Sequence, residues 1–380
     1  MSDIVILGAK RTAIGSFLGQ FNGVPTPALG EAAIRGALEH AGLSPDQVDE
    51  TIMGCVLPAG LGQAPARQAS RAAGIPAAAG CTPINTVCGS GMKAAMLGHD
   101  MIRAGSAQVV VAGGMESMTN APHLLNGSRN GIRYGSAEFL DHMAWDGLTN
   151  PYDGKAMGVF GDEACRKYGF SREDLGEYSA ESARRARTAI AEGRFADEVV
   201  PVTVKTRKGE VVVDTDEEPG RIDLSRIPTL RAAFGKDGLL TAASSSKISD
   251  GAAALVLASA DDAAARGCRP LARIVAHAGH AQEPEWFTTA PVKAIDNVMT
   301  KAGWSVEDVD LFEVNEAFAC VAMAPMKDLG IPHQKLNVNG GACALGHPIG
   351  ASGALLVVPL LHALKARNPE RGVATLCTGG

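Results

Sequence analysis

The chain has 380 residues, of which 46% are hydrophobic and 20% are charged, and its formal net charge is -6. This length and composition are typical of a soluble globular protein with two or three domains. No basic tract is present to neutralise phosphates, so we expect no nucleic-acid partner. The longest apolar stretch, 251–260, is too short to span a bilayer, and the first residues lack a signal-peptide pattern, so we expect no membrane association.

Eight cysteines are spread along the chain without a C-x-x-C pair. In a chain without an export signal, this distribution predicts reduced thiols and a cytoplasmic location. The cysteine spacing of zinc sites is also missing, so we expect no metal.

The N-terminal part alternates between apolar strands and amphipathic helices. "DIVILGAK" and "QVVVAGG" have the composition of buried strands, and "ALGEAAIRGALEHAG" has helical periodicity and ends at Gly42. This alternation predicts βαβ units, and therefore an α/β fold with a largely parallel sheet that is covered on both faces.

The segment "NTVCGSGMKAAM" places Cys88 in a glycine-rich turn directly before a predicted helix. Free amides and the helix dipole at such a position lower the pKa of a thiol, and the same amides can hold an oxyanion. A buried, inert cysteine is the alternative. Gly89, Gly91 and Ala94 also fit a loose dinucleotide-binding fingerprint, although the preceding "GCTPINTV" is a poor match to the strand that this fingerprint needs.

Residues 118–249 differ from the flanking sequence because they are rich in predicted loops. One helix is strongly indicated, from the N-cap Ser171, with Asp174 completing a capping box, to Gly193. An insertion of this kind can cover a substrate site, or it can serve folding or oligomerisation.

Three further motifs carry polar side chains in glycine-rich or strand-end positions. Asn315 follows an apolar strand in "VNEAFA", His347 lies in the loop "NGGACALGHPIGASG", and Cys377 precedes two glycines in "LCTGG". An imidazole in a loop can act as a base, and amides at strand ends can stabilise an oxyanion. Each residue also has a structural explanation, as a core histidine, a strand-end cap or a buried thiol.

The sequence contains an internal repeat. "AGLSPDQVDETIMGCV" at 41–56 aligns with "AGWSVEDVDLFEVNEA" at 302–317, and Ser90-Gly91 aligns with Ser352-Gly353 at nearly the same offset. Two copies are too few for a solenoid, so we interpret the repeat as a duplicated domain. The loop of His347 is then the copy of the Cys88 turn, and the two loops are expected to meet between the halves.

Taken together, these motifs closely resemble the thiolase family over essentially the whole chain. The resemblance implies a duplicated βαβαβαββ core in five layers (α-β-α-β-α) with an inserted loop domain, usually as a homotetramer. It divides the chain into an N-terminal half, 1–117, completed by 250–271; a loop domain over the active site, 118–249; and a C-terminal half, 272–380, that lacks its last strand.

The implied activity is the reversible condensation of two acetyl-CoA molecules to acetoacetyl-CoA and CoA. By resemblance, Cys88 is the acylated nucleophile, His347 is its base, and Cys377 moves the α-proton. Asn315, through a water, and His347 would form one oxyanion site, and the amides of Cys88 and Gly379 the other. No cofactor is implied beyond CoA, which is substrate and product. The implied CoA contacts are Leu148, Met157, Phe234, Ser246 and Arg221.

Three other functions remain open on the sequence alone. One is a 3-ketoacyl-CoA thiolase with a broader chain-length range. The second is a non-catalytic protein that senses CoA or thiols, and the third is a dinucleotide-dependent oxidoreductase.

Overall fold

The structure is a computed structural model that describes residues 2–379. Its largest sheet has the strand order β12-β1-β11-β5-β3-β4, with the short strands β2 beside β11 and β8 beside β1. The strands are β1 (Ile4–Thr12), β2 (Gly15–Ser16), β3 (Glu50–Gly54), β4 (Gly80–Ile84), β5 (Val109–Ser117), β8 (Val199–Val200), β11 (Ser249–Ser259) and β12 (Ala272–Arg273).

This sheet is mixed, so the expectation of a largely parallel sheet is correct only for part of it. β5, β3 and β4 are parallel, whereas the central strand β11 runs antiparallel to both β1 and β5. The register pairs Asp250 with Ser117, so the inserted segment leaves and re-enters the sheet at neighbouring points. Because the chain leaves at the end of β5 and re-enters beside that end, β11 must run in the opposite direction to β5.

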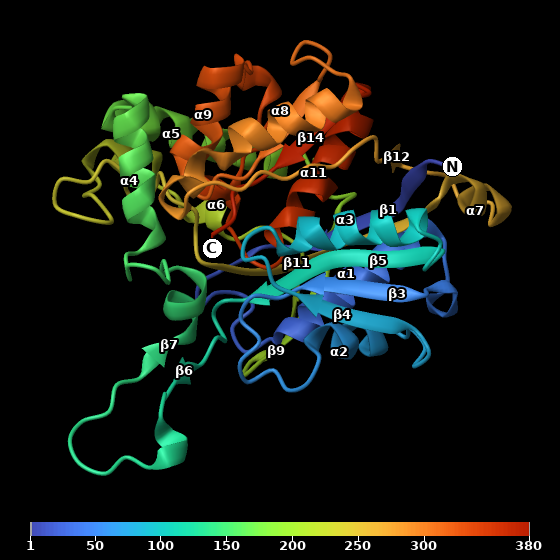
Figure 1. The fold of residues 1–380 in the computed structure, drawn as a ribbon, viewed down its shortest axis with the longest axis horizontal. Coiled ribbons are helices and arrows are strands. Elements are labelled where there is room, and N and C mark those ends of the chain that lie inside the picture. Colours follow the sequence, from blue (N-terminus) through green and yellow to red (C-terminus); the bar gives the residue numbers. More distant parts are fainter. Residues whose placement is uncertain (1, 380) are drawn as a thin grey trace.

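Helices and sheets alternate in layers through the molecule (Figure 1). α1 (Thr26–Ala41) and α2 (Pro65–Ala72) cover one face of the large sheet, and α3 (Ser90–Arg103) and α11 (Ser352–Arg367) cover the other. α11 also packs on a second sheet, in which β13 (Leu311–Val314) and β14 (Gly372–Thr375) are parallel. α8 (Ala290–Ala302) and α9 (Ala319–Leu329) form the outer layer beyond it.

A groove of about 1100 Å³ borders β14 and the segment 272–282. Its lining includes apolar side chains from α3, α8 and α11. By the internal repeat β14 corresponds to β5, which has β11 as its neighbour in the large sheet. Within residues 2–379, the two-stranded sheet has no counterpart of β11 beside β14.

The two middle helices begin in direct backbone contact. A Cβ atom added at Gly353 would lie 2.2 Å from the backbone nitrogen of Met92, and one added at Gly91 would lie 2.8 Å from that of Ala354. Only glycine allows this approach. The Ser-Gly pairs of the repeat therefore bring the N-termini of α3 and α11 together between the two sheets.

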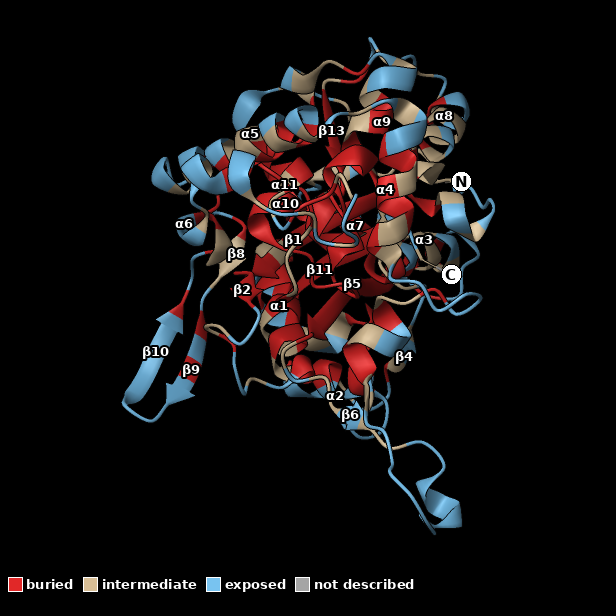
Figure 2. Ribbon diagram, turned by 90° about the vertical axis from the view of Figure 1, so that its left-hand side faces the viewer, coloured by how far each residue is buried: buried red, intermediate tan, exposed pale blue. Residues whose placement is uncertain are grey.

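The inserted segment contains α4 (Met157–Tyr168) and α5 (Arg172–Ala191), with the predicted capping box of Ser171 and Asp174 present at the start of α5. A buried ion pair ties this segment to the large sheet. Arg11 of β1 contacts Glu198 at 2.7 Å and Asp216 at 2.7 Å. Figure 2 shows the buried residues concentrated in the sheets and middle helices, while the β9–β10 hairpin and the arm after β6 project as exposed extensions.

No helix within residues 2–379 has both the length and the apolar character that crossing a membrane requires.

The remaining elements are β6 (His123–Leu124), β7 (Leu140–Asp141), β9 (Val202–Thr206), β10 (Gly209–Val213), α6 (Glu218–Arg221), α7 (Ala260–Ala265) and α10 (Ala342–Leu345), with short 3-10 or π turns at Pro45–Gln47, Ser128–Asn130, Met143–Gly147, Leu224–Thr229, Pro284–Thr289 and His333–Lys335.

Candidate active site

Cys88 lies in a tight turn between β4 and α3. The turn forces the residue before it, Val87, to a φ of 49°, which is costly for a β-branched side chain. The hydroxyl of Ser90 donates to the Val87 carbonyl at 2.6 Å and accepts from the Thr86 amide at 2.9 Å. These hydrogen bonds hold the strained turn, and with it the position of the Cys88 side chain.

The same turn does not form a dinucleotide site. A strand, β4, does precede it, contrary to our expectation from "GCTPINTV", but β4 is an edge strand, where Pro83 is tolerated. A Cβ atom added at Gly89 would lie 2.5 Å from the Thr378 side chain, and the space beside Gly91 is filled by α11. Protein atoms therefore occupy the room that a pyrophosphate would need.

His347 is buried in the loop between α10 and α11, and its Nε2 atom lies 3.2 Å from the Sγ atom of Cys88. Its Nδ1 atom is hydrogen-bonded to the hydroxyl of Ser352, which itself donates to the Pro348 carbonyl at 2.8 Å. Since that hydroxyl proton is already used, Nδ1 must carry the imidazole proton and donate it. Nε2 is then left with a lone pair that faces the Cys88 thiol.

Burial sets the protonation states of this pair. It raises the pKa of Cys88 to about 11, although the backbone amides of Gly379 and Cys88 act in the opposite direction. Burial also lowers the pKa of His347 to about 4. The prediction that the helix terminus lowers the pKa of Cys88 is therefore wrong in its net direction, because desolvation outweighs the amides. At neutral pH the pair is a neutral thiol beside a neutral imidazole.

The ends of β13 and β14 supply the other groups at this point. Asn315 follows β13, and its Nδ2 atom lies 3.5 Å from Nε2 of His347. Cys377 follows β14 and is fully buried. Burial, and then the proximity of a second ionisable thiol in Cys88, raise the pKa of the Cys377 thiol well above the usual range. The backbone amide of Gly379, like that of Cys88, lies near the Cys88 sulfur and acts to lower its pKa. The structure thus brings together all five residues expected at the catalytic site.

Two of the expected CoA contacts lie near this cluster. Leu148 packs in the same apolar cluster as Cys88, and its carbonyl accepts a hydrogen bond from the Met157 amide at 3.0 Å. The Met157 side chain reaches Gly379, where an added Cβ atom would lie 3.2 Å from its methyl group. Apolar side chains therefore line the approach to the thiol.

Two further expected CoA contacts adjoin the Asn315 loop, and one does not. The Ser246 amide donates to the Ala317 carbonyl at 3.0 Å, and Phe234 stacks edge-to-face on Phe318 with ring centroids 5.7 Å apart. Arg221 instead forms an ion pair with Glu217 on the exposed end of α6, and its contacts do not join it to this cluster.

Sequence reasoning missed Glu116, which is fully buried near the end of β5. Its carboxylate accepts the amides of Val56 at 2.9 Å, Leu57 at 3.2 Å and Gly350 at 2.9 Å, and burial raises its pKa to about 7. Glu116 thereby ties the His347 loop to the first half of the molecule. The one available signal was a glutamate at the end of an otherwise apolar strand, "VVVAGGMES".

Comparison with known proteins agrees with this geometry. The profile of the thiolase N-terminal domain matches residues 4–261, and that of the thiolase C-terminal domain matches residues 268–380. The chain belongs to the thiolase family. The fold class expected from the sequence is therefore confirmed, and the chain is an enzyme of this family.

Similar proteins extend over the full chain. An acetyl-CoA acetyltransferase of Pseudomonas aeruginosa is 47% identical over 100% of this chain and 97% of its own. A mitochondrial acetyl-CoA acetyltransferase of Bos taurus is 46% identical over 100% of this chain and 90% of its own. The crystal structure of the Acat5 thiolase from Ascaris suum in complex with coenzyme A has a TM-score of 0.95 and 41% identity, covering 100% of this chain and 97% of that one.

Proposed function

We propose that this thiolase is an acetyl-CoA C-acetyltransferase, which condenses two acetyl-CoA molecules reversibly to acetoacetyl-CoA and CoA. The observation that carries the proposal is the distance of 3.2 Å between Sγ of Cys88 and Nε2 of His347, with Cys377 and the Gly379 amide beside them. The names of relatives that are 45–48% identical over the full chain support the choice of substrate.

In the first half-reaction, the Cys88 sulfur attacks the thioester carbonyl while His347 accepts the thiol proton on Nε2. The amides of Cys88 and Gly379 are the backbone donors next to this sulfur, and we assign to them the stabilisation of the oxyanion of the tetrahedral intermediate. The carbon–sulfur bond to CoA then breaks, and the Cys377 thiol gives its proton to the departing CoA thiolate, so that Cys377 becomes a thiolate while His347 keeps the proton on Nε2. The product is acetyl-Cys88, a thioester that keeps the acetyl group activated.

In the second half-reaction, the Cys377 thiolate accepts an α-proton from a second acetyl-CoA and returns to the thiol. Asn315, through a water, and the Nε2–H of protonated His347 stabilise the resulting enolate oxygen. The enolate carbon attacks acetyl-Cys88, the bond to the Cys88 sulfur breaks, and acetoacetyl-CoA is released. The departing Cys88 thiolate takes its proton back from Nε2 of His347, which restores the starting state. No metal or redox cofactor takes part, since the acyl group moves between thiols without a change of oxidation state.

CoA would enter along the apolar approach formed by Leu148 and Met157, with Ser246 and Phe234 along the Asn315 loop. Arg221 is the weakest member of this set, because its guanidinium is paired with Glu217.

We further propose a homotetramer in the cytoplasm. All eight cysteines are unpaired thiols, as expected for a reducing compartment. The projecting arm after β6 exposes the large apolar side chains of Ile132, Tyr134 and Phe139. Exposed apolar side chains gathered on one segment favour contact with another subunit. Light scattering coupled to size-exclusion chromatography measures the assembly, and a monomer at micromolar concentration would contradict it.

Mass spectrometry after mixing with acetyl-CoA tests the catalytic proposal. We expect an acetyl group on the peptide that contains Cys88, and release of acetoacetyl-CoA with time. The Cys377→Ala variant should still be acetylated on Cys88 but should form no acetoacetyl-CoA. Cys268→Ala, at a half-buried thiol outside the site, is the matched control and should behave as wild type.

Two outcomes would overturn the proposal. Acetylation of Cys88 without turnover in the wild type would indicate a sensing protein. Faster thiolysis of a longer 3-ketoacyl-CoA than of acetoacetyl-CoA would indicate a thiolase with a broader chain-length range.

A further inference from the structure

A cluster of two imidazoles and one carboxylate lies at the end of α3 that is remote from Cys88. Oδ1 of Asp100 is 2.9 Å from Nδ1 of His99 and 2.9 Å from Nε2 of His277. The two rings meet edge to face, with centroids 4.9 Å apart. His99 and Asp100 belong to α3, whereas His277 comes from the irregular segment after β12, so the cluster joins two separate parts of the chain.

The donor atoms converge closely enough to share one ion. The available nitrogen and oxygen atoms of the three residues all lie within 4.8 Å of one another. A tetrahedral zinc ion with bonds of about 2.1 Å separates neighbouring ligand atoms by roughly 3.4 Å. The two nitrogen–oxygen distances of 2.9 Å would therefore need to widen by only about 0.5 Å.

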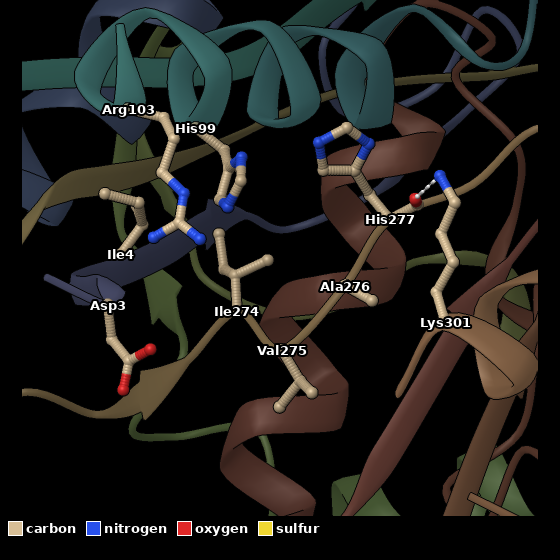
Figure 3. A pocket seen from close by; sticks show the side chains of 9 residues that line it. All are labelled: Asp3, Ile4, His99, Arg103, Ile274, Val275, Ala276, His277 and Lys301. Atoms are coloured by element: carbon tan, nitrogen blue, oxygen red, sulfur yellow. Dashed lines mark hydrogen bonds between the residues drawn. The ribbon is translucent and has the colours of Figure 1, made fainter. Parts of the chain in front are cut away.

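The charges around the cluster are compatible with a cation. Oδ1 of Asp100 accepts hydrogen bonds from both His99 and His277, so the carboxylate presents its lone pairs at the point where the two rings converge. α3 ends at Arg103, and the carbonyl end of a helix favours positive charge. Figure 3 shows His99 projecting from α3 and the ring of His277 lying under the same helix, with Lys301 hydrogen-bonded to the His277 carbonyl.

The two nearby cationic side chains, Lys301 and Arg103, each donate a hydrogen bond to a backbone carbonyl. Nζ of Lys301 donates to the His277 carbonyl at 3.1 Å, and Nη1 of Arg103 donates to the Ser2 carbonyl at 2.9 Å. Neither interaction uses the imidazole nitrogens or the Asp100 carboxylate. The Lys301 contact also holds the backbone of His277 where its ring meets Asp100.

We propose that His99, Asp100 and His277 form a binding site for a divalent transition-metal ion of the zinc class. Two imidazoles and a carboxylate are a donor set that such ions favour, and the partial exposure of the side chains leaves room for water as a further ligand. Each imidazole now directs an N–H at Asp100; on binding the ion, each ring would carry its proton on its other nitrogen and turn the freed lone pair to the ion, with the same carboxylate as third donor. The ion would cross-link α3 to the segment 274–282, independently of the proposed acyl transfer.

Titration of the full chain with Co²⁺, followed by visible absorption, tests the site. We expect one ion per chain with the spectrum of nitrogen and oxygen ligands, and displacement of Co²⁺ by Zn²⁺. The His277→Gln and Asp100→Asn variants should each bind at least about 10-fold more weakly. His280→Gln is the matched control, because this exposed histidine of the same segment pairs with Gln282, outside the cluster.

Three results would overturn the proposal. One is a wild-type protein that fails to bind Co²⁺ or Zn²⁺ at concentrations up to about 1 mM, which corresponds to only about 4 kcal/mol of binding free energy. Another is an affinity that is unchanged in His277→Gln. The third is a cobalt spectrum with thiolate charge-transfer bands, which would place the ion on cysteines. None of these measurements depends on catalytic activity.

Discussion

The hydrogen bond between His347 and Ser352 decides which imidazole nitrogen faces the nucleophile. The Ser352 hydroxyl donates to Pro348 and can only accept from Nδ1, so the unprotonated Nε2 is presented to Cys88. Ser352 is therefore a positioning residue, which acts through the orientation and tautomer of the base.

Replacement of Ser352 by alanine should lower kcat by about 10- to 100-fold with little change in KM, because the imidazole loses the acceptor that fixes its tautomer. Thiolysis of acetoacetyl-CoA measures both constants. Ser352→Thr keeps the hydroxyl and should recover most of kcat, provided that its thermal midpoint is close to that of the wild type. An alanine variant with wild-type kcat would contradict the assignment.

The neutral state of Cys88 has a consequence for its reactivity. Only the thiolate is alkylated. Because the pKa of Cys88 is raised to about 11, the fraction of Cys88 present as thiolate increases steadily with pH up to that value. The rate of Cys88 alkylation by iodoacetamide should therefore increase about tenfold per pH unit between about pH 7 and about pH 9. Peptide mass spectrometry at each pH measures this rate, and circular dichroism checks that the fold is intact. A plateau below about pH 8 would mean that a thiolate–imidazolium pair forms instead.

At the level of secondary structure, the site depends on the contact between the starts of α3 and α11. Glycine in both Ser-Gly pairs lets the two helices approach until their backbones touch, so each helix start supports the loop that precedes the other. Cys88 and His347 lie on these two loops, and their distance of 3.2 Å follows from the helix contact.

Gly353→Ala should destabilise the protein by about 3 kcal/mol and reduce activity, because the added methyl group would lie 2.2 Å from the Met92 backbone nitrogen. Urea denaturation measures the change. The matched control is Gly176→Ala inside α5, where the nearest atom would be 3.4 Å away; its stability should stay within about 1 kcal/mol of wild type or increase. Equal effects of the two substitutions would contradict the role of the helix contact.

On the scale of the whole molecule, buried ion pairs join the inserted segment to the large sheet. Arg11 in β1 is matched by Glu198 and Asp216, which come from two places in the insertion. Loss of the guanidinium would leave two buried carboxylates without their counter-charge, and this costs more than the pair itself stabilises.

Arg11→Met should therefore lower the free energy of unfolding by about 3 to 5 kcal/mol. Arg35→Met removes the partner of Glu31 in an exposed i,i+4 ion pair on α1. This substitution should change the free energy of unfolding by no more than about 0.5 kcal/mol. Urea denaturation of the two variants measures both changes. Similar losses of stability would contradict the role of the buried Arg11 ion pair.

The sequence by itself determined the family, the duplication and the positions of the reactive groups. These follow from local signals: the glycine turns around Cys88 and His347, the capping box at Ser171, and apolar strands whose pattern does not depend on distant residues. The two copies of the Ser-Gly pair also indicated that the loops meet, because a repeat implies a symmetric interface.

Only the tertiary structure decided the chemistry of these groups. Desolvation raises the pKa of Cys88 and lowers that of His347, and it depends on atoms drawn from the whole chain. The tautomer of His347, the anchoring role of Glu116 and the antiparallel direction of β11 likewise arise from contacts between segments that are far apart in sequence. A linear pattern places a side chain on a loop, but its protonation state is set by what surrounds it after folding.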